Sequence, residues 1–545
     1  MQSTAEACCV VTVCENVQKH IDGSKGSKYG ETASRQTERL SCSGAIVNDR
    51  AGIVLCSGLV FSRFLICHHS ISSDPHFLSP HSISNKLQVY IECSVRRLVT
   101  NPRSVAVEAK RKVSNFKAEL VMLVNCREFQ SAFRTVFKET DKWSFYCGED
   151  DSELKKDAVF LSWFAVLRVP GLAKSEHGRT TPWIPSSSLE KGCVVFACGS
   201  PFGSFCPDLF MSTVSKGIIS NLAGEDHAVI LTDARCLPGT EGGGLYVTRG
   251  DHAHLVGLIV SPLCWKSGEW IGLTLVCSFH LILRNIAMVV NLHHPLKELC
   301  APLHMDSTEG VPHKGQCTAM QNYPMVALVD SGQSWGSGVL MDSQLMLTCR
   351  HVVNGKSRLT VRFKTDDRFL AVMGEVLYST KMSSPYDIAV VLLNEQLPGI
   401  VVPTLGSAFK QGEDVYVISY GAFGHSCGPL VTSGVLSHTV RCRSQPVMLQ
   451  TTCAVQAGAS GGAVVRVYTG ELLGLVASNT RDVVTGVTYP HLNFSVPFTL
   501  LEPLLQHFSM TGNPAVFQEL DTAGDEVRRV WQLQSMLKEV PQCKL

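Results

Sequence analysis

The chain repeats a set of glycine-punctuated motifs in one order, and this limits the fold more than any other feature. "EDVYVISYGAFGHSCGPLVTSGVLSHTV" resembles "GCVVFACGSPFGSFCPDLFMSTVSKGIISNL", and "QTTCAVQAGASGGAVV" resembles "TDARCLPGTEGGGLYV". The matched segments are 413–440 with 192–222, 450–465 with 232–247 and, more weakly, 337–353 with 57–72. Three matches in the same order predict two copies of one fold.

Short β-branched runs make up most of both copies, for example "RLTVRF", "DIAVVLL" and "GAVVRV". Their spacing favours an all-β barrel or sandwich over βαβ units. Helical periodicity is convincing only near 113–140, around 280–300 and after 515. We therefore predict these parts: a variable N-terminal segment 1–40, a first copy 41–290 with an insertion at about 75–150, a linker 291–320, a second copy 321–510 and a C-terminal tail 511–545.

Composition excludes several functions. A net charge of +1 gives no electrostatic surface for nucleic acid or anionic membranes, and no apolar run approaches the length of a membrane span. The 22 cysteines are scattered through apolar runs without any Cys-x-x-Cys pair. This pattern predicts free thiols in a reducing compartment and no metal site. No cofactor is implied.

The second copy carries the parts of a catalytic triad. A serine needs a base to take its proton, and the base needs an orienting carboxylate. "GSGVLMDSQLMLTCRHVV" places His351 at the end of a strand, "YDIAVVLL" places Asp387 at the start of one, and "AGASGG" places Ser460 in a glycine-rich turn. The order His, Asp, Ser is that of the chymotrypsin arrangement. Cys349 is an alternative nucleophile, but two residues before the base its side chain should face away from Ser460.

The same turn predicts an oxyanion hole made by the N–H groups of Gly458 and Ser460. Ala454, six residues before the serine, is expected at the floor of the specificity pocket, with Ala477, Ser478 and Asn479 as the opposite wall. An uncharged floor argues against cleavage after Arg or Lys. It favours a small or medium apolar P1 residue, cysteine included.

The first copy departs from this pattern. His69 falls where the catalytic histidine is expected, but Glu241 replaces the serine in "PGTEGGG". No aspartate matches the third position, because the corresponding strand is 161–169 and Asp157 lies too early. We predict an inactive copy that serves as a scaffold or dimer surface, with substrate docking or inhibition as the alternative.

The chain ends in Cys543, Lys544 and Leu545, which is similar to the Ser-Lys-Leu peroxisomal address. The preceding "DEVRRVWQLQSMLKEVPQ" predicts a short amphipathic helix and a loose end that could present the tripeptide to an import receptor. Chance is the alternative explanation. The N-terminus shows no secretory signal.

The second copy resembles the Deg/HtrA branch of trypsin-like proteases in "GSGVLMDSQLMLTCRHVV", "YDIAVVLL" and "QTTCAVQAGASGG". Nearly all of 40–545 is similar to the peroxisomal leader peptide-processing family, through "LPGTEGGG", "CGSPFGSFCPD", "PLCWKSGEWIG" and "TYPHLNFSVP". The resemblance implies two chymotrypsin/trypsin-like double β-barrel units in tandem, the first degenerate, with a few helices.

It also implies a function in the peroxisomal matrix: removal of N-terminal leaders from imported enzymes of fatty-acid β-oxidation. The implied substrates are thiolase, acyl-CoA oxidase and sterol carrier protein, cleaved near cysteine. Self-cleavage is implied too, with Cys93 as the candidate and Cys126 as the second choice. The extra copy and the Deg/HtrA resemblance leave room for a homo-oligomer.

Three other functions stay open on the sequence alone. A pseudoprotease would bind peptides or act as a chaperone without turnover. A secreted digestive protease would need a signal peptide and paired cysteines, which we do not see. A cytosolic or mitochondrial quality-control protease would require the terminal tripeptide to be inert.

Overall fold

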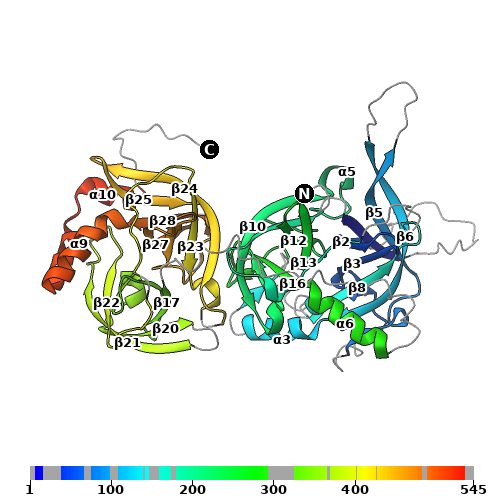
Figure 1. Cartoon of the computed structure of the whole chain (residues 1–545), viewed down its shortest axis with the longest axis horizontal. Helices are drawn as coiled ribbons and strands as arrows, with labels where there is room; N and C mark the ends of the chain where they lie inside the picture. Colours follow the sequence, from blue (N-terminus) through cyan, green and yellow to red (C-terminus); the bar gives the residue numbers. More distant parts are fainter. Residues whose placement is uncertain are drawn as a thin grey trace, which may run out of the picture.

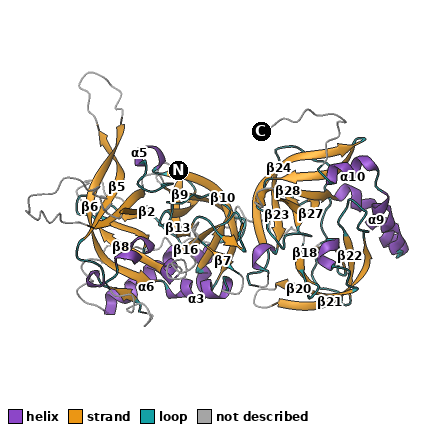
Figure 2. Ribbon diagram, turned by 180° about the vertical axis from the view of Figure 1, so that it is seen from behind, coloured by secondary structure: helices purple, strands orange, loops and turns teal. Residues whose placement is uncertain are grey.

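The structure of the chain is a computed structural model. It describes residues 7–15, 39–66, 75–98, 109–138, 142–145, 159–172, 180–292, 325–364, 369–400, 402–424, 426–481 and 488–533. Within them, two units lie side by side, and each is built from two six-stranded barrels (Figure 1). The architecture is almost all strand, with short helices at the edges of the barrels (Figure 2). This confirms the predicted all-β fold. No helix among the described residues is long and apolar enough to cross a membrane.

The second unit consists of two closed barrels joined in sequence. The first barrel contains β17 (Val326–Asp330), β18 (Trp335–Leu340), β19 (Leu345–Thr348), β20 (Arg358–Lys364), β21 (Phe369–Ser379) and β22 (Ala389–Leu393), in the order β17-β18-β19-β22-β21-β20. The second contains β23 (Asp414–Ser419), β24 (Leu430–Cys442), β25 (Gln445–Thr451), β26 (Ala463–Arg466), β27 (Leu472–Arg481) and β28 (Thr488–Pro497), in the order β23-β24-β25-β28-β27-β26. Every second side chain of a strand points into the barrel and fills its interior. In β20, Leu359, Val361 and Phe363 are buried between more exposed neighbours.

The first unit repeats this topology. Its first barrel contains β1 (Cys8–Glu15), β2 (Arg39–Asn48), β3 (Ile53–Ser57), β5 (Leu87–Leu98), β6 (Ala109–Asn125) and β8 (Trp163–Arg168), with β4 (Phe77–Leu78) added to β6. The ring closes because β6 pairs with both β5 and β8. The second barrel has the order β10-β11-β16-β13-β12-β9 and contains β9 (Val194–Gly199), β10 (Thr213–Ala223), β11 (Val229–Thr232), β12 (Gly244–Arg249), β13 (His252–Ser261) and β16 (Thr274–Ser278).

Three boundaries differ from the sequence prediction. β1 lies in the segment that we assigned to a variable N-terminus, and it pairs with β2 and β5. The predicted insertion at about 75–150 supplies β5 and β6, which are barrel strands. The helix predicted near 113–140 is strand up to Asn125, and only α3 (Arg127–Val136) is helical. The charged run "AKRKVSNFKAE" hid the strand, because it lacks the apolar alternation of a half-buried strand.

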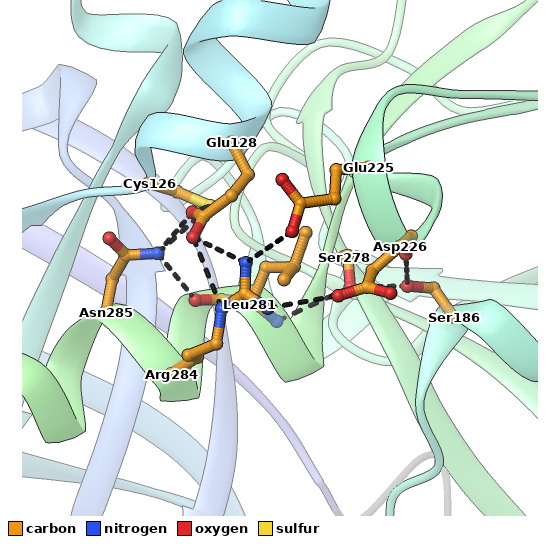
Figure 3. A network of polar contacts seen from close by, with 9 residues as sticks. All are labelled: Cys126, Glu128, Ser186, Glu225, Asp226, Ser278, Leu281, Arg284 and Asn285. Atoms are coloured by element: carbon orange, nitrogen blue, oxygen red, sulfur yellow. Dashed lines mark hydrogen bonds and ion pairs between the residues drawn. The ribbon is translucent and has the colours of Figure 1, made fainter.

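Five other helices of the described segments lie on the barrels: α5 (Pro207–Phe210), α6 (Phe279–Leu292), α8 (Arg350–Val353), α9 (Phe498–Thr511) and α10 (Asp525–Trp531). In the first unit, α6 is held by a polar network (Figure 3). Arg284 donates to Glu128 Oε1 at 2.7 Å and to Asp226 Oδ2 at 3.0 Å, and Asn285 Nδ2 donates to Glu128 Oε2 at 2.6 Å. Burial alone would raise the pKa of Glu128, but the hydrogen bonds from Arg284 and Asn285 keep this pKa below its usual value. The network therefore ties α3, α6 and the β10–β11 loop together as one rigid corner of the first unit.

The two units meet along β10 and β24. Asp233, at the end of β11, is buried, and its carboxylate accepts Ile218 N–H at 2.7 Å. It also accepts Ser433 N–H at 2.5 Å and the Ser433 hydroxyl at 2.7 Å from the other unit. Nearby, Lys191 Nζ donates to the Pro429 carbonyl at 2.6 Å. Burial raises the pKa of Asp233, against the opposing effect of these N–H donors.

We expect Asp233→Ala to lower the melting temperature by about 5 °C or more. A hydrogen bond to a charged group contributes about 1.5–3 kcal/mol, and each kcal/mol shifts the midpoint of a domain of this size by about 2–4 °C. Differential scanning calorimetry measures the change. Asp251→Ala, in an exposed turn, is the control. Equal midpoints for both variants would show that Asp233 does not hold the units together.

Candidate functional site

The pairing of two strands brings His351 and Asp387 together. Thr348, the last residue of β19, pairs with Ala389, the first residue of β22. The chain beyond these ends therefore meets: His351 lies in the first turn of α8, and Asp387 lies just before β22. His351 Nδ1 hydrogen-bonds Asp387 Oδ2, and His351 N–H donates to Asp387 Oδ1 at 3.0 Å.

This pair has the electrostatics of a base and its orienting carboxylate. The His351 side chain is 51% exposed, whereas that of Asp387 is 20% exposed. Burial alone would raise the pKa of Asp387, but the hydrogen bond from His351 and the charges of His351 and Arg350 hold it below its usual value. The carboxylate therefore stays ionised and fixes the imidazole, which leaves its other nitrogen, Nε2, for a reacting group.

Ser460 lies in a turn that only glycine allows on either side of it. Gly458 has φ of +89° and Gly461 has φ of +84°. A Cβ at Gly458 would lie 2.2 Å from the Trp335 ring, and one at Gly461 would lie 2.0 Å from the Ser337 carbonyl oxygen. Both neighbours belong to β18, so the turn of the second barrel is fitted against the first barrel.

Ser337 holds this turn from β18. Its N–H donates to the Ser460 carbonyl at 2.8 Å, and its hydroxyl donates to the Gly458 carbonyl at 2.8 Å. Across the described residues, neither Gly458 N–H nor Ser460 N–H finds a protein acceptor, while Ala459 N–H donates to the Gln456 carbonyl at 3.0 Å. Two N–H groups of one turn, both without a partner among the described residues, are what an oxyanion hole requires.

The Val476 carbonyl links the turn around Ser460 to the segment that carries His351. It accepts Gly461 N–H at 2.7 Å and the Cys349 thiol at 3.2 Å. Cys349 is fully buried, and burial, followed by the charge of Asp387, raises the pKa of its thiol well above the usual value. It therefore stays protonated and is a poor nucleophile, although its side chain lies beside the turn of Ser460 and does not face away from it. The same property makes it a poor metal ligand, although its Sγ lies within 4.8 Å of ligand atoms of His351 and Asp387.

The matching turn of the first unit, around Glu241, is stabilised by the Glu241 side chain. Gly239 and Gly242 have φ of +95° and +80°, and Gly242 N–H donates to the Ile259 carbonyl as Gly461 N–H donates to that of Val476. Glu241 takes the place of Ser460, and its Oε2 accepts Gly239 N–H at 2.7 Å. Burial raises the pKa of Glu241 to about 6, although its own N–H and that of Gly239 act in the opposite direction. A carboxylate oxygen thus accepts the Gly239 N–H, whereas the corresponding Gly458 N–H has no protein acceptor among the described residues.

The other two catalytic positions of the first unit are apolar. Cys56 pairs with Ala165 in the first unit, as Thr348 pairs with Ala389 in the second. Because His351 follows Thr348 by three residues, the matching position after Cys56 is Leu59. The same register places Trp163, which is buried, at the position of Asp387. Assigning this position to His69 was therefore wrong, and His69 itself lies outside the described residues. The error came from matching 57–72 to 337–353, whereas the structure aligns 43–61 with them.

The predicted pocket residues lie on two neighbouring segments. Ala454, after β25, and Ala477, in β27, are buried, while Ser478 is exposed and Asn479 is partly exposed. Sequence reasoning missed two further contributors. His491, in β28, and the main chain of the first unit at Gly272 both approach Ala454. No motif signals a contact between the two copies, because main-chain atoms of the first unit make it.

Three predicted sites of other kinds remain: two self-cleavage candidates and the C-terminal tripeptide. Cys93 lies in the middle of β5, opposite Cys9 on one side and Ser114 on the other, and is buried. Cys126 caps α3 and is fully buried. A protease could bind either segment only after local unfolding. The terminal Cys543-Lys544-Leu545 lies outside the described residues.

Comparison with known proteins identifies the family of this chain. Residues 336–475 match the trypsin-like peptidase domain family. The chain is 39% identical over 543 residues to the peroxisomal leader peptide-processing protease of Mus musculus, covering 93% of this chain and 94% of that protein. It is 38% identical over 540 residues to the protein of the same name from Homo sapiens, with the same coverage of both chains. A solved structure of the HtrA-type protease AlgW with a decapeptide is 22% identical and covers 36% of this chain and 68% of that chain, with a TM-score of 0.30. The chain therefore belongs to the family of peroxisomal leader peptide-processing proteases, which carry a trypsin-like peptidase domain.

Proposed function

We propose that this chain is a serine endopeptidase that removes N-terminal targeting leaders from imported peroxisomal enzymes. The observation that carries the proposal is the His351–Asp387 hydrogen bond beside a turn in which the N–H groups of Gly458 and Ser460 find no acceptor in the described part of the chain. The names of the mouse and human relatives supply the substrate class and the compartment.

The proposed mechanism uses this chain's own groups. Ser460 Oγ attacks the scissile carbonyl as His351 Nε2 takes its proton, and Asp387 stabilises the imidazolium. The N–H groups of Gly458 and Ser460 stabilise the oxyanion. His351 then gives the proton to the leaving amine, and water repeats the sequence on the acyl-enzyme. An extended substrate would pair with β27 at 476–480, beside the small, uncharged residues Ala454 and Ala477.

The proposed location is the peroxisomal matrix, reached through the terminal Cys543-Lys544-Leu545 and an import receptor. The proposed substrates are enzymes of fatty-acid β-oxidation of the thiolase, acyl-CoA oxidase and sterol carrier protein types. Self-cleavage near Cys93 belongs to the same proposal. It requires β5 to separate from β1 and β6 first, because both flank Cys93.

We expect Asp387→Asn to reduce kcat/KM on a leader peptide by about 10⁴-fold, because the imidazole would be held in the wrong tautomer. The melting temperature should change little, since the carboxamide has the shape of the carboxylate. Asp525→Asn, in the exposed first turn of α10, is the matched control. A fall of less than tenfold would remove Asp387 from the proposed triad.

We expect Gly458→Ala to reduce kcat by about 10²–10³-fold, the effect of losing one oxyanion donor. A methyl group there would collide with Trp335 and turn the N–H away. Gly355→Ala is the control, because Gly355 also has a positive φ, of +71°, but has open space around it. Steady-state kinetics of both variants separates loss of the oxyanion hole from backbone strain alone. Equal activities would contradict the assignment.

The deciding experiment compares wild type with Ser460→Ala on a cysteine-containing leader peptide, with a fluorophosphonate probe as a second readout. We expect cleavage and labelling by wild type only. Labelling of wild type without cleavage would keep the hydrolase and remove the leader substrate. Equal cleavage by both proteins would show that Ser460 is not the nucleophile.

A further inference from the structure

A short hairpin of the inactive unit lies against the active site of the other unit. This hairpin, 264–272, contains β14 (Trp265–Lys266) and β15 (Glu269–Trp270). The Ile271 carbonyl accepts Gln456 Nε2 at 2.7 Å, and the Gln456 carbonyl in turn accepts Ala459 N–H. Gln456 therefore connects the hairpin of the inactive unit to Ala459, the residue before Ser460.

Lys266 makes a second connection. Its Nζ donates to the Ala422 carbonyl and lies 6.0 Å from the centroid of the Trp335 ring. That ring packs directly against Gly458. Gly458 and Ala459, the two residues before Ser460, thus both contact groups that the hairpin touches.

The third connection is at the predicted floor of the pocket. A Cβ on Gly272 would lie 3.1 Å from Ala454 Cβ and 3.2 Å from His491 Nε2. The main chain of the inactive unit therefore closes over Ala454 and His491 with no room for a side chain. Trp270 reinforces this contact, with its ring edge-on to His491 at a centroid distance of 5.5 Å.

The environment of the His491 side chain is energetically unfavourable. Its Nδ1 lies 3.2 Å from the Thr452 carbonyl oxygen, so Nδ1 carries the proton and Nε2 is an acceptor. Burial, followed by the charge of Arg235, lowers the pKa of His491 and keeps the ring neutral. Nε2 is buried and has no hydrogen-bond partner among the described residues. Such a group costs about 1–3 kcal/mol and calls for an explanation.

We propose that the hairpin 264–272 of the inactive unit and His491 together form the base of the P1 pocket, and that this base restricts cleavage to substrates with a short P1 side chain. The inference rests on the proposed function, since it deepens the specificity of the same site. The imidazole and the Gly272 main chain fill the space below Ala454 into which a longer side chain would extend. Replacing His491 or Trp270 by alanine should therefore deepen the pocket.

The test measures kcat/KM for the full chain on leader peptides that differ only at P1: Ala, Ser, Cys, Leu or Phe. The variants are His491→Ala, Trp270→Ala on the inactive unit and, as a control, His507→Ala on the exposed face of α9. Fluorophosphonate labelling of Ser460 reports whether the catalytic turn is intact in each protein.

In wild type we expect short P1 residues to exceed Leu and Phe by about tenfold or more, the usual scale for steric discrimination in a pocket. His491→Ala should raise the Leu-to-Ala ratio about tenfold, and Trp270→Ala should raise it by a smaller factor. His507→Ala should leave the ratio unchanged.

Two results would overturn the inference. One is normal labelling of His491→Ala and Trp270→Ala with the wild-type P1 ratio. The other is a wild type that prefers Leu or Phe. If His491→Ala fails to label, Trp270→Ala alone decides, because its side chain belongs to the other unit. Labelled wild type that cuts no peptide of the series would overturn the leader-processing function itself.

Discussion

The candidate site depends on how β18 of one barrel holds the turn around Ser460 in the other. Ser337 binds the carbonyl groups of Gly458 and Ser460, while Trp335 and Ser337 leave no space for a side chain at Gly458 or Gly461. Ser337 thus holds the turn at Gly458 and at Ser460, on both sides of Ala459, without any ligand. The geometry that we propose for stabilising an oxyanion is therefore set by the junction between barrels, before a substrate arrives.

Sequence reasoning worked where the signal is local and close to a strand end. The all-β fold and the proximity of His351 to Asp387 could be predicted, because each residue sits beside a recognisable apolar strand. It failed for His69, because several apolar runs in the first copy have similar lengths and only strand register separates them. It could not predict the hydrogen bond from Gln456 to the Ile271 carbonyl. Every residue has a main-chain carbonyl, so no residue type marks the one that makes the contact.

The two copies show how one turn can keep its shape after losing its chemistry. Gly239 and Gly242 keep the positive φ values of their counterparts, but Glu241 supplies an anion to the amides from within the chain. Because Leu59 and Trp163 occupy the other two positions, the described part of this unit has no histidine–aspartate pair beside the turn. The packing of this unit against the other through Asp233 and the hairpin 264–272 gives a physical reason for its retention.

The strand pairing within the first unit would hold this unit together even if its chain were cut. β5 and β6 are paired from Val89 opposite Ala118 to Leu98 opposite Ala109, and β1 is paired on both sides, with β2 and β5. A peptide bond broken between β5 and β6 would leave every one of these ladders in place. The cut protein would migrate as two fragments under denaturing conditions yet remain a single folded particle, with the base of its active-site pocket still in position.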